Sequence, residues 1–411
     1  MLKVGFVGAG FVAGFHATSL ASVRDAEVTG IMALAGAEAL AERCKKLGVG
    51  TPKVYSTVGE MCKAVDVVAI FAPNFARMEI AEQIAEARAA GAELKGLICE
   101  KPLARNMKEA ETMVAAAKKG KHSTAYFENQ IHMPSVRNAR AQLSAVESAM
   151  GPVHLTRSAE EHGGPHEAWF WDPTKQGGGV LCDMGCHSIA VGWYMLTPHG
   201  QKPAFLTPKS ITAHTMLLKW GLKGWREKLM ARGVDYTKTP AEDYATGAVT
   251  FENPKTKQQV VAQFTDSWMY DAPGLRLLME ALGPGYSYTV NSLTSPAGIF
   301  ISDEAATAIS DAELALEKSQ ASRGALILQP NEADLYGYVD EWRDAVAAFS
   351  QGRSPLLDWE YGLEITRLVM AGYLSGERGA TVDLTDPRVQ KELSTYIPAI
   401  QAGEGSKVFG K

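Results

Sequence analysis

The chain has little that would suit a nucleic acid or a membrane. Its 46 acidic residues outnumber its 41 lysines and arginines, which gives a formal net charge of −5. Nucleic acids and anionic membranes bind basic surfaces, so this balance argues against either as the main partner. No apolar run reaches the roughly 18 residues that a membrane-spanning helix needs. The amino terminus enters a glycine turn too early for a secretory signal.

Cysteine is also scarce. The five cysteines are spread thinly along the chain, at Cys44, Cys62, Cys99, Cys182 and Cys186. An odd, scattered set does not form a disulfide framework and is typical of a reducing compartment, so we expect a cytoplasmic protein. Cys182, Cys186 and His187 resemble zinc ligands in their spacing. Catalytic zinc needs three converging ligands, and no further cysteine lies nearby, so we predict no metal.

Length and hydrophobic pattern predict two domains. The 411 residues exceed what one hydrophobic core usually supports. Up to about residue 130, short continuous apolar runs alternate with alanine-rich amphipathic segments. Strands of this kind are buried on both faces, as in a parallel sheet covered by helices. We predict a doubly wound α/β (Rossmann) domain over residues 1–130, with strands near 3–7, 26–34, 66–71, 97–99 and 123–127.

The pattern changes in the rest of the chain, residues 131–411. Few helices separate the later strand-like runs, which lie near 153–158, 210–215, 245–251, 260–268 and 275–282. This order predicts a C-terminal α/β domain with a large, mostly antiparallel open sheet. We expect this domain to bind substrate. An alanine-rich segment, 303–322, and two amphipathic segments, 336–349 and 360–373, are predicted to be helical.

A glycine turn follows the first predicted strand and opens the first helix. It reads Gly8-Ala9-Gly10-Phe11-Val12-Ala13 and matches the dinucleotide fingerprint, with alanine in the third small position. Gly8 permits the tight turn, and Gly10 lets a pyrophosphate approach the backbone. The helix N-terminus supplies free N–H groups for the phosphates. We therefore predict a dinucleotide here, in contact with Gly8, Gly10, Phe11, Val12 and Ala13.

The end of the second strand carries little that would select between cofactors. The residues from Ile31 to Gly36 include no carboxylate to bind the adenosine ribose. They include no arginine for a 2′-phosphate either. Because the cationic partners of a 2′-phosphate are missing, we expect NAD, with Ala33 among its contacts and NADP as the alternative.

Two polar elements suit the chemistry of a hydroxyl group. Lys101, in Glu100-Lys101-Pro102, follows a buried strand, and the carboxyl end of such a strand faces the ligand crevice. Asp183 and His187 open an expected helix, where four-residue spacing places both on one face. A carboxylate beside an imidazole raises its basicity, which suits removal of a hydroxyl proton. Taken alone, each element also fits a structural role, as a surface lysine or a capping aspartate with a buried histidine.

Taken together, these motifs resemble the Gfo/Idh/MocA family of NAD(P)-dependent oxidoreductases, which includes glucose-fructose oxidoreductase and inositol dehydrogenases. The resemblance runs from the glycine turn through Pro73-Asn74 and residues 100–102 to 177–179 and 183–187. It implies a Rossmann domain and an α/β domain whose open sheet often mediates oligomerisation, and hence a homo-oligomer, a dimer or tetramer. It also implies that Lys101, Asp183 and His187 are catalytic, with His187 as the acid/base.

Further contacts are predicted around this group. Cofactor contacts are expected from Pro73, Asn74, Arg77, Glu100, Lys101 and Asn129. Arg77 stands where the family usually has a histidine, and the arginine common near residues 127–130 is absent. Substrate contacts are expected from Lys101, His162, Trp171, Asp183 and His187. Two glycines and a proline between His162 and His166 preclude the helical spacing that zinc would require.

Three functions are compatible with this sequence. The first is a dehydrogenase that transfers a hydride between NAD(P) and a secondary hydroxyl of a sugar, glycoside or inositol. The second is an NAD-dependent glycoside hydrolase that uses transient oxidation, elimination and water addition. One candidate substrate is an anionic, sulfonated or carboxylated sugar, which Arg77 and the basic segment 219–232 could hold. That segment also reads as a solvated amphipathic helix. The third is a non-catalytic NAD-binding regulator, which an intact Lys101, Asp183 and His187 set disfavours.

Overall fold

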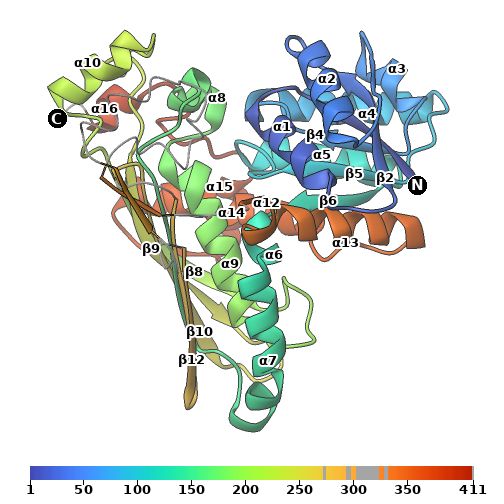
Figure 1. Ribbon diagram of the computed structural model, residues 1–411. Helices are drawn as coiled ribbons and strands as arrows, with labels where there is room; N and C mark the ends of the chain where they lie inside the picture. The colour runs from blue at the N-terminus through green and yellow to red at the C-terminus, as the bar shows by residue number, and fades with distance from the viewer. Residues whose placement is uncertain (272–274, 293–297, 302–323, 328–331, 410–411) are drawn as a thin grey trace. The chain divides into compact units, whose positions relative to one another are not determined.

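The fold comprises two compact units, seen in a computed structural model (Figure 1). The structure describes residues 1–271, 275–292, 298–301, 324–327 and 332–409, so the predicted helix at 303–322 lies outside the described residues. The first unit contains Met1–Asn138, Ala333–Arg367 and Leu393–Tyr396, and the second contains Ala139–Glu332, Leu368–Glu392 and Ile397–Lys411. The domain boundary predicted at residue 130 stays a prediction. The compact units differ from it because a late segment of the chain returns to the first sheet.

The first unit is built on a six-stranded parallel sheet. Its strand order is β3-β2-β1-β4-β5-β6, the order of a dinucleotide-binding doubly wound sheet. Every residue of β4 and β5 is buried, as their continuous apolar runs predict. The predicted Rossmann fold is therefore confirmed. The strands are β1 (Leu2–Val7), β2 (Ala26–Met32), β3 (Lys53–Val54), β4 (Val67–Ile70), β5 (Gly96–Glu100) and β6 (Ser123–Phe127).

Helices cover this sheet, and one of them comes from far along the chain. Helix α13 (Tyr338–Gln351) lies along the sheet next to β6 (Figure 1). Its apolar stripe, which includes Trp342 and Phe349, joins the same core as Phe6 and Phe127. The chain-order helices are α1 (Phe11–Leu20), α2 (Ala37–Leu47), α3 (Val58–Cys62), α4 (Arg77–Ala89), α5 (Met107–Lys119), α6 (Asn129–His132) and α7 (Pro134–Met150).

The second unit is built on a seven-stranded mixed sheet in the order β12-β11-β7-β10-β9-β8-β15. Only the pairing of β7 with β10 is parallel among its described pairs, so the predicted mostly antiparallel sheet is confirmed. Helix α9 (Cys186–Leu196) packs on β7 and β10 and is buried at every residue. The strands are β7 (Leu155–Glu161), β8 (Thr207–Met216), β9 (Tyr244–Glu252), β10 (Gln259–Ser267), β11 (Arg276–Gly283), β12 (Tyr286–Asn291) and β15 (Val382–Asp383).

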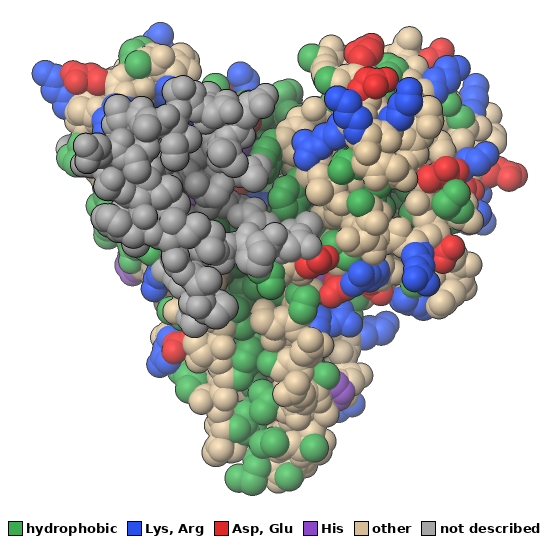
Figure 2. All heavy atoms as spheres, viewed as in Figure 1, with side chains coloured by type: hydrophobic (Ala, Val, Ile, Leu, Met, Phe, Trp, Pro, Cys, Tyr) green, Lys and Arg blue, Asp and Glu red, His purple; other side chains and the backbone are tan. Residues whose placement is uncertain are grey.

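A two-stranded pair and six further α-helices complete the described strands and α-helices. Strands β13 (Gly298–Ile301) and β14 (Gly324–Ile327) form a separate antiparallel pair. Across the described ranges, no helix has the length and apolar character to cross a membrane. In the face shown in Figure 2, acidic and basic side chains are interspersed over the first unit. The remaining helices are α8 (Pro173–Gln176), α10 (Lys223–Ala231), α12 (Glu332–Leu335), α14 (Trp359–Arg378), α15 (Pro387–Leu393) and α16 (Gly405–Phe409).

Candidate functional site

The glycine turn in the first unit has the geometry that a pyrophosphate requires. Gly8 has a φ of 112°, and a Cβ there would lie 2.8 Å from the carbonyl carbon and oxygen of Phe71. Only glycine fits that position. Gly10 is the N-cap of α1, and a Cβ on it would meet no atom within 4 Å. Space that a phosphate could fill therefore lies beside the N-terminus of α1, and Ala13 is fully buried in the first turn of this helix. These residues fit a dinucleotide.

The residues directly after β2, Ala33 to Gly36, carry no charged side chain that could bind the cofactor ribose. Ala33 is half-buried, and Leu34 is fully exposed. Glu38 is exposed on α2. Arg43, one turn further along α2, donates a hydrogen bond of 2.9 Å to Thr18 Oγ1 on α1. This hydrogen bond joins the two helices and uses one of the five N–H groups of the guanidinium.

Several residues predicted to contact the cofactor make hydrogen bonds within the chain. Buried Arg77 donates to the backbone carbonyls of Ala72 (2.9 Å), Glu100 (2.6 Å) and Pro102, which ties the end of β4 to the end of β5. The Asn129 amide donates to the Tyr336 carbonyl at 2.8 Å. Pro73 and buried Asn74 begin a 3₁₀ turn, η1 (Asn74–Ala76). Cofactor contacts from Pro73, Asn74, Arg77, Glu100 and Asn129 stay predictions.

Lys101 lies directly after β5, as predicted. Its side chain is half-buried, and its peptide bond to Pro102 is cis. The backbone N–H of Lys101 donates to Glu100 Oε2 at 2.8 Å and to the Phe127 carbonyl at 3.2 Å. The backbone that carries the lysine is thus held from two sides.

Asp183 lies just before α9 and His187 lies in its first turn, both buried in the second unit. Asp183 Oδ2 accepts a hydrogen bond of 3.2 Å from the indole N–H of Trp268. His187 Nε2 lies 4.0 Å from Glu160 Oε2. The prediction of one regular helix through both residues is wrong in detail. Asp183 belongs to a π-helical turn, η3 (Leu181–Gly185), before α9 begins, and spacing alone does not distinguish the two helix types.

Glu160 and Trp268 are partners of this pair that the sequence analysis did not identify. A signal for Glu160 exists, because β7 alternates and its buried face carries Thr156, Ser158 and Glu160. Trp268 follows β10, the strand paired with β7, and has no comparable signal.

A buried carboxylate holds the glycine turn that leads to Asp183. Glu242 Oε1 accepts the backbone N–H groups of Gly179 (3.1 Å) and Leu181 (3.0 Å) and the hydroxyl of Tyr373 (2.6 Å). A Cβ on Gly179 would lie 2.2 Å from the Glu242 carbonyl oxygen, so glycine is required there. Burial raises the pKa of Glu242 from 4.5 to about 7, against the lowering effect of these hydrogen bonds.

We expect Glu242→Gln to flatten the pH dependence of stability. The folded protein holds the Glu242 proton more tightly than the unfolded chain, so this stabilisation is present below about pH 4.5 and is lost as pH rises through about 7. The shift corresponds to about 3 kcal/mol. Urea denaturation at pH 5 and pH 8 measures the slope. Glu252→Gln, at the other end of β9, is the control and should keep the parent slope. Equal slopes in Glu242→Gln and the parent would contradict the assignment.

The loop after β7 carries His162 and Trp171, the other predicted substrate contacts. His162 Nδ1 accepts the Gly164 N–H at 2.9 Å. Trp171 is 1% exposed, and its indole N–H donates to the Pro165 carbonyl at 3.0 Å. Its ring packs against other aromatic rings, those of Trp220, Tyr236 and Trp268. The structure therefore gives Trp171 a packing role, and contact of either residue with substrate stays a prediction.

The basic segment of the second unit is folded against its own aromatic residues. Lys219 pairs with Asp271, and its ammonium lies 4.2 Å from the centre of the Trp225 ring. Lys228 lies 3.7 Å from the centre of the same ring. On α10 only Leu229 is buried, as expected of a solvated amphipathic helix.

Comparisons with known proteins agree with this fold. Residues 2–127 match the oxidoreductase family with an NAD-binding Rossmann fold, and residues 137–283 match the GFO/IDH/MocA C-terminal domain. The structure of GenD2 from gentamicin A biosynthesis, in complex with NAD, superposes with a TM-score of 0.73 at 23% identity. That superposition covers 94% of this chain and 97% of GenD2.

The curated relatives match this chain over only part of their length. Glucose-6-phosphate 3-dehydrogenase of Bacillus subtilis (strain 168) is 28% identical over 203 residues, 47% of this chain and 54% of the relative. D-glucoside 3-dehydrogenase of Escherichia coli (strain K12) is 29% identical over 221 residues, 52% of this chain and 57% of the relative. The chain spans about half the length of the curated relatives it matches. From the two family matches, the chain belongs to the Gfo/Idh/MocA oxidoreductase family, and its first 127 residues contain an NAD-binding Rossmann domain.

Proposed function

We propose that this protein is an NAD-dependent dehydrogenase that acts on a secondary hydroxyl of a sugar, glycoside or inositol. The observation that carries the proposal is the space beside Gly10 at the N-terminus of α1, where a pyrophosphate could bind. The chain also contains Lys101, Asp183 and His187. Relatives named as dehydrogenases of glucose 6-phosphate, D-glucosides and myo-inositol support the substrate class. A homo-oligomer and a cytoplasmic location stay predictions.

Different residues of the chain would bind the cofactor, bind the substrate and accept the hydroxyl proton. When bound, NAD supplies the hydride acceptor. The N–H groups at Gly10 and the start of α1 hold its pyrophosphate. Lys101 donates a hydrogen bond to the substrate hydroxyl, and His187 accepts the hydroxyl proton as the carbon loses its hydride. Asp183, fixed by the Trp268 indole, stabilises the imidazolium that forms.

We propose NAD in preference to NADP. A 2′-phosphate needs a charge-assisted partner, since desolvating it without one is costly. The stretch from Ile31 to Gly36 offers none, and the nearest arginine on α2, Arg43, is bonded to Thr18.

The redox-neutral glycosidase is the competing proposal. If its substrate is an anionic sugar, that sugar would need cations such as Arg77 or those of the basic segment. Arg77 donates to three backbone carbonyls, and Lys219 is paired with Asp271. These interactions favour the dehydrogenase.

One screen separates the two reactions. The purified protein is incubated with glycosides and inositols, with NAD or NADP, while reduced cofactor is followed by absorbance and released aglycone is measured in parallel. We expect NADH to accumulate in proportion to substrate, with a clear preference for NAD. Aglycone release without net NADH would identify the glycosidase, and a preference for NADP would contradict the cofactor proposal.

A further inference from the structure

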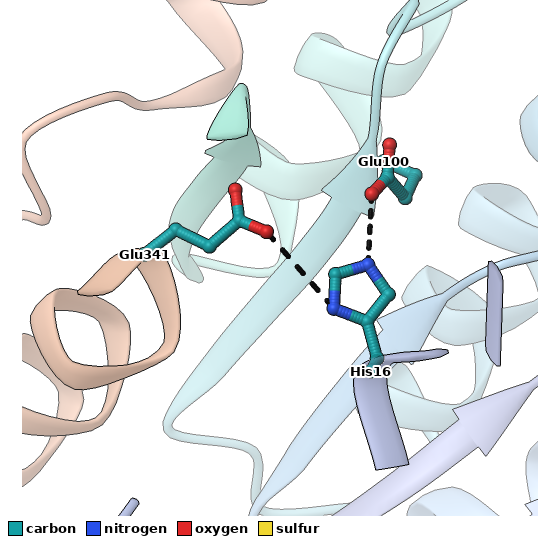
Figure 3. A group of neighbouring side chains, drawn as sticks. All are labelled: His16, Glu100 and Glu341. Atoms are coloured by element: carbon teal, nitrogen blue, oxygen red, sulfur yellow. Dashed lines mark hydrogen bonds and ion pairs between the residues drawn. The ribbon is translucent and has the colours of Figure 1, made fainter. Parts of the chain in front are cut away.

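A buried polar cluster lies inside the first unit, behind the dinucleotide turn. His16 of α1, Glu100 at the end of β5 and Glu341 of α13 point toward one another (Figure 3). His16 is fully buried, and its ring stacks on Phe71 with 4.3 Å between ring centres. His16 Nε2 lies 2.8 Å from Glu100 Oε1, and His16 Nδ1 lies 4.0 Å from Glu341 Oε1.

The partners of His16 determine which ring nitrogen carries the proton. The indole N–H of Trp342 donates to Nδ1 at 3.0 Å, and an indole can only donate. Nδ1 is therefore the acceptor, so Nε2 carries the proton and donates to the Glu100 carboxylate. A metal ion would need a free ring lone pair, and in the described contacts the lone pair on Nδ1 is already used.

Glu341, on the Nδ1 side of the ring, does not hydrogen-bond to His16. Both of its carboxyl oxygens are buried without a hydrogen-bond partner among the described residues. Burial, with the nearby charges of Glu100 and Glu128, raises its pKa well above the ordinary value. At 4.0 Å, Glu341 Oε1 is beyond hydrogen-bond distance of Nδ1, which leaves Trp342 as the hydrogen-bond partner of that nitrogen.

Glu100 connects His16 to the backbone of Lys101. Its Oε1 is held by His16, and its Oε2 accepts the backbone N–H of Lys101 at 2.8 Å. A buried carboxylate that loses one of its donors is costly and tends to rearrange. The Lys101 N–H also donates to the Phe127 carbonyl, so His16 supports one of the two contacts that orient the Lys101 backbone. His16 follows Gly10 by less than two helical turns.

We infer that His16, whose Nδ1 accepts from Trp342, is a positioning residue that fixes Glu100 and through it the Lys101 turn. The same contacts join the nucleotide-binding helix to the strand end that presents the proposed hydrogen-bond donor to substrate. The catalytic consequence rests on the proposed function, whereas the tautomer and the ordering of the turn do not.

Hydrogen exchange tests the positioning without any substrate. In His16→Leu with NAD bound, the backbone amide of Lys101 should exchange at least tenfold faster, while the β4 amides keep the parent rate. His16→Gln retains a side-chain N–H donor and should restore most of the protection. On an identified substrate, kcat of His16→Leu should fall about 10- to 100-fold with little change in KM. Parent-like exchange in His16→Leu, or faster exchange with parent kcat, would overturn the inference.

Nitrogen NMR of histidine-labelled protein tests the tautomer directly and does not depend on the folding of His16→Leu. The His16 signal, identified by its loss in His16→Gln, should show a proton on Nε2 in the parent. Trp342→Phe should shift the Nδ1 signal, which loses its hydrogen bond, while the Glu100 carboxylate keeps the proton on Nε2. Trp359→Phe is the matched control, because Trp359 is equally buried and its N–H donates to the Ala125 carbonyl. A proton on Nδ1 in the parent, or a parent-like Nδ1 signal in Trp342→Phe, would overturn the role given to Trp342.

Discussion

Replacing His187 with alanine should lower kcat by about 10²- to 10⁴-fold and leave NAD affinity nearly unchanged, the loss expected for a general acid/base. The affinity should persist because the dinucleotide residues lie in the first unit and His187 lies in the second. Asp183→Asn should slow turnover as well, since the imidazolium loses its stabilising charge. Lys101→Ala should lower turnover by removing the proposed donor to the substrate hydroxyl. If the three residues serve one transition state, double variants should lose far less than the product of the single losses.

His187 is buried, so the experiment has to separate catalysis from folding. His214→Ala is a matched control, because His214 is exposed on β8 of the same unit. Melting temperature, NAD affinity and single-turnover rate are measured on the same preparations. A purely structural His187 would lower the melting temperature and leave the rate per folded molecule unchanged. A folded His187→Ala that turns over at the parent rate would refute the proposed acid/base.

Gly10→Asp should abolish the rise in melting temperature that NAD gives the parent. Bound NAD at a hundredfold excess over its Kd would stabilise the fold by about 2.7 kcal/mol. The aspartate places a carboxylate where the pyrophosphate would lie. The apo fold should survive, because Gly10 has an ordinary φ of −78°, has open space around its Cβ, and occupies an N-cap, where aspartate is favourable. Thermal melts with and without NAD measure the effect.

Gly59→Asp is the control for that substitution. Gly59 lies on α3 in the same unit, and a Cβ on it would also meet no atom within 4 Å. This variant should keep the full NAD-dependent shift. A parent-like shift in Gly10→Asp would place the dinucleotide elsewhere.

The sequence predicted the two sheets better than it predicted which elements complete them. Continuous apolar runs identified the five longer parallel strands, whereas β3 (Lys53–Val54) is too short to leave a pattern. The runs near 153–158 and 260–268 correspond to β7 and β10. The 336–349 helix was also foreseen, but its place on the first sheet was not. Only tertiary packing of its apolar stripe decides which sheet it covers.

Candidate site residues that lie within one motif could be singled out from the sequence. Their hydrogen-bond partners from distant parts of the chain could not. Asp183 and His187 are four residues apart, and a spacing argument reaches them. His16 and Trp342 are separated by 326 residues, and Asp183 and Trp268 by 85. Glu242, two residues before β9, contacts the 179–181 turn from more than sixty residues along the chain. Hydrogen bonds of this kind are set by the fold and leave no periodicity in the sequence.

The return of α13 to the first unit makes completion of that unit dependent on the whole length of the chain. During synthesis, the residues up to Asn138 leave the ribosome about two hundred residues before Tyr338 does. At 5–20 residues per second, the Rossmann sheet would wait roughly 10–40 s for the helix that packs beside Phe6 and Phe127. Until then His16 has neither Trp342 nor Glu341 beside it. The nucleotide-binding half of the protein, although made first, would reach its final form only after most of the second unit has been synthesised.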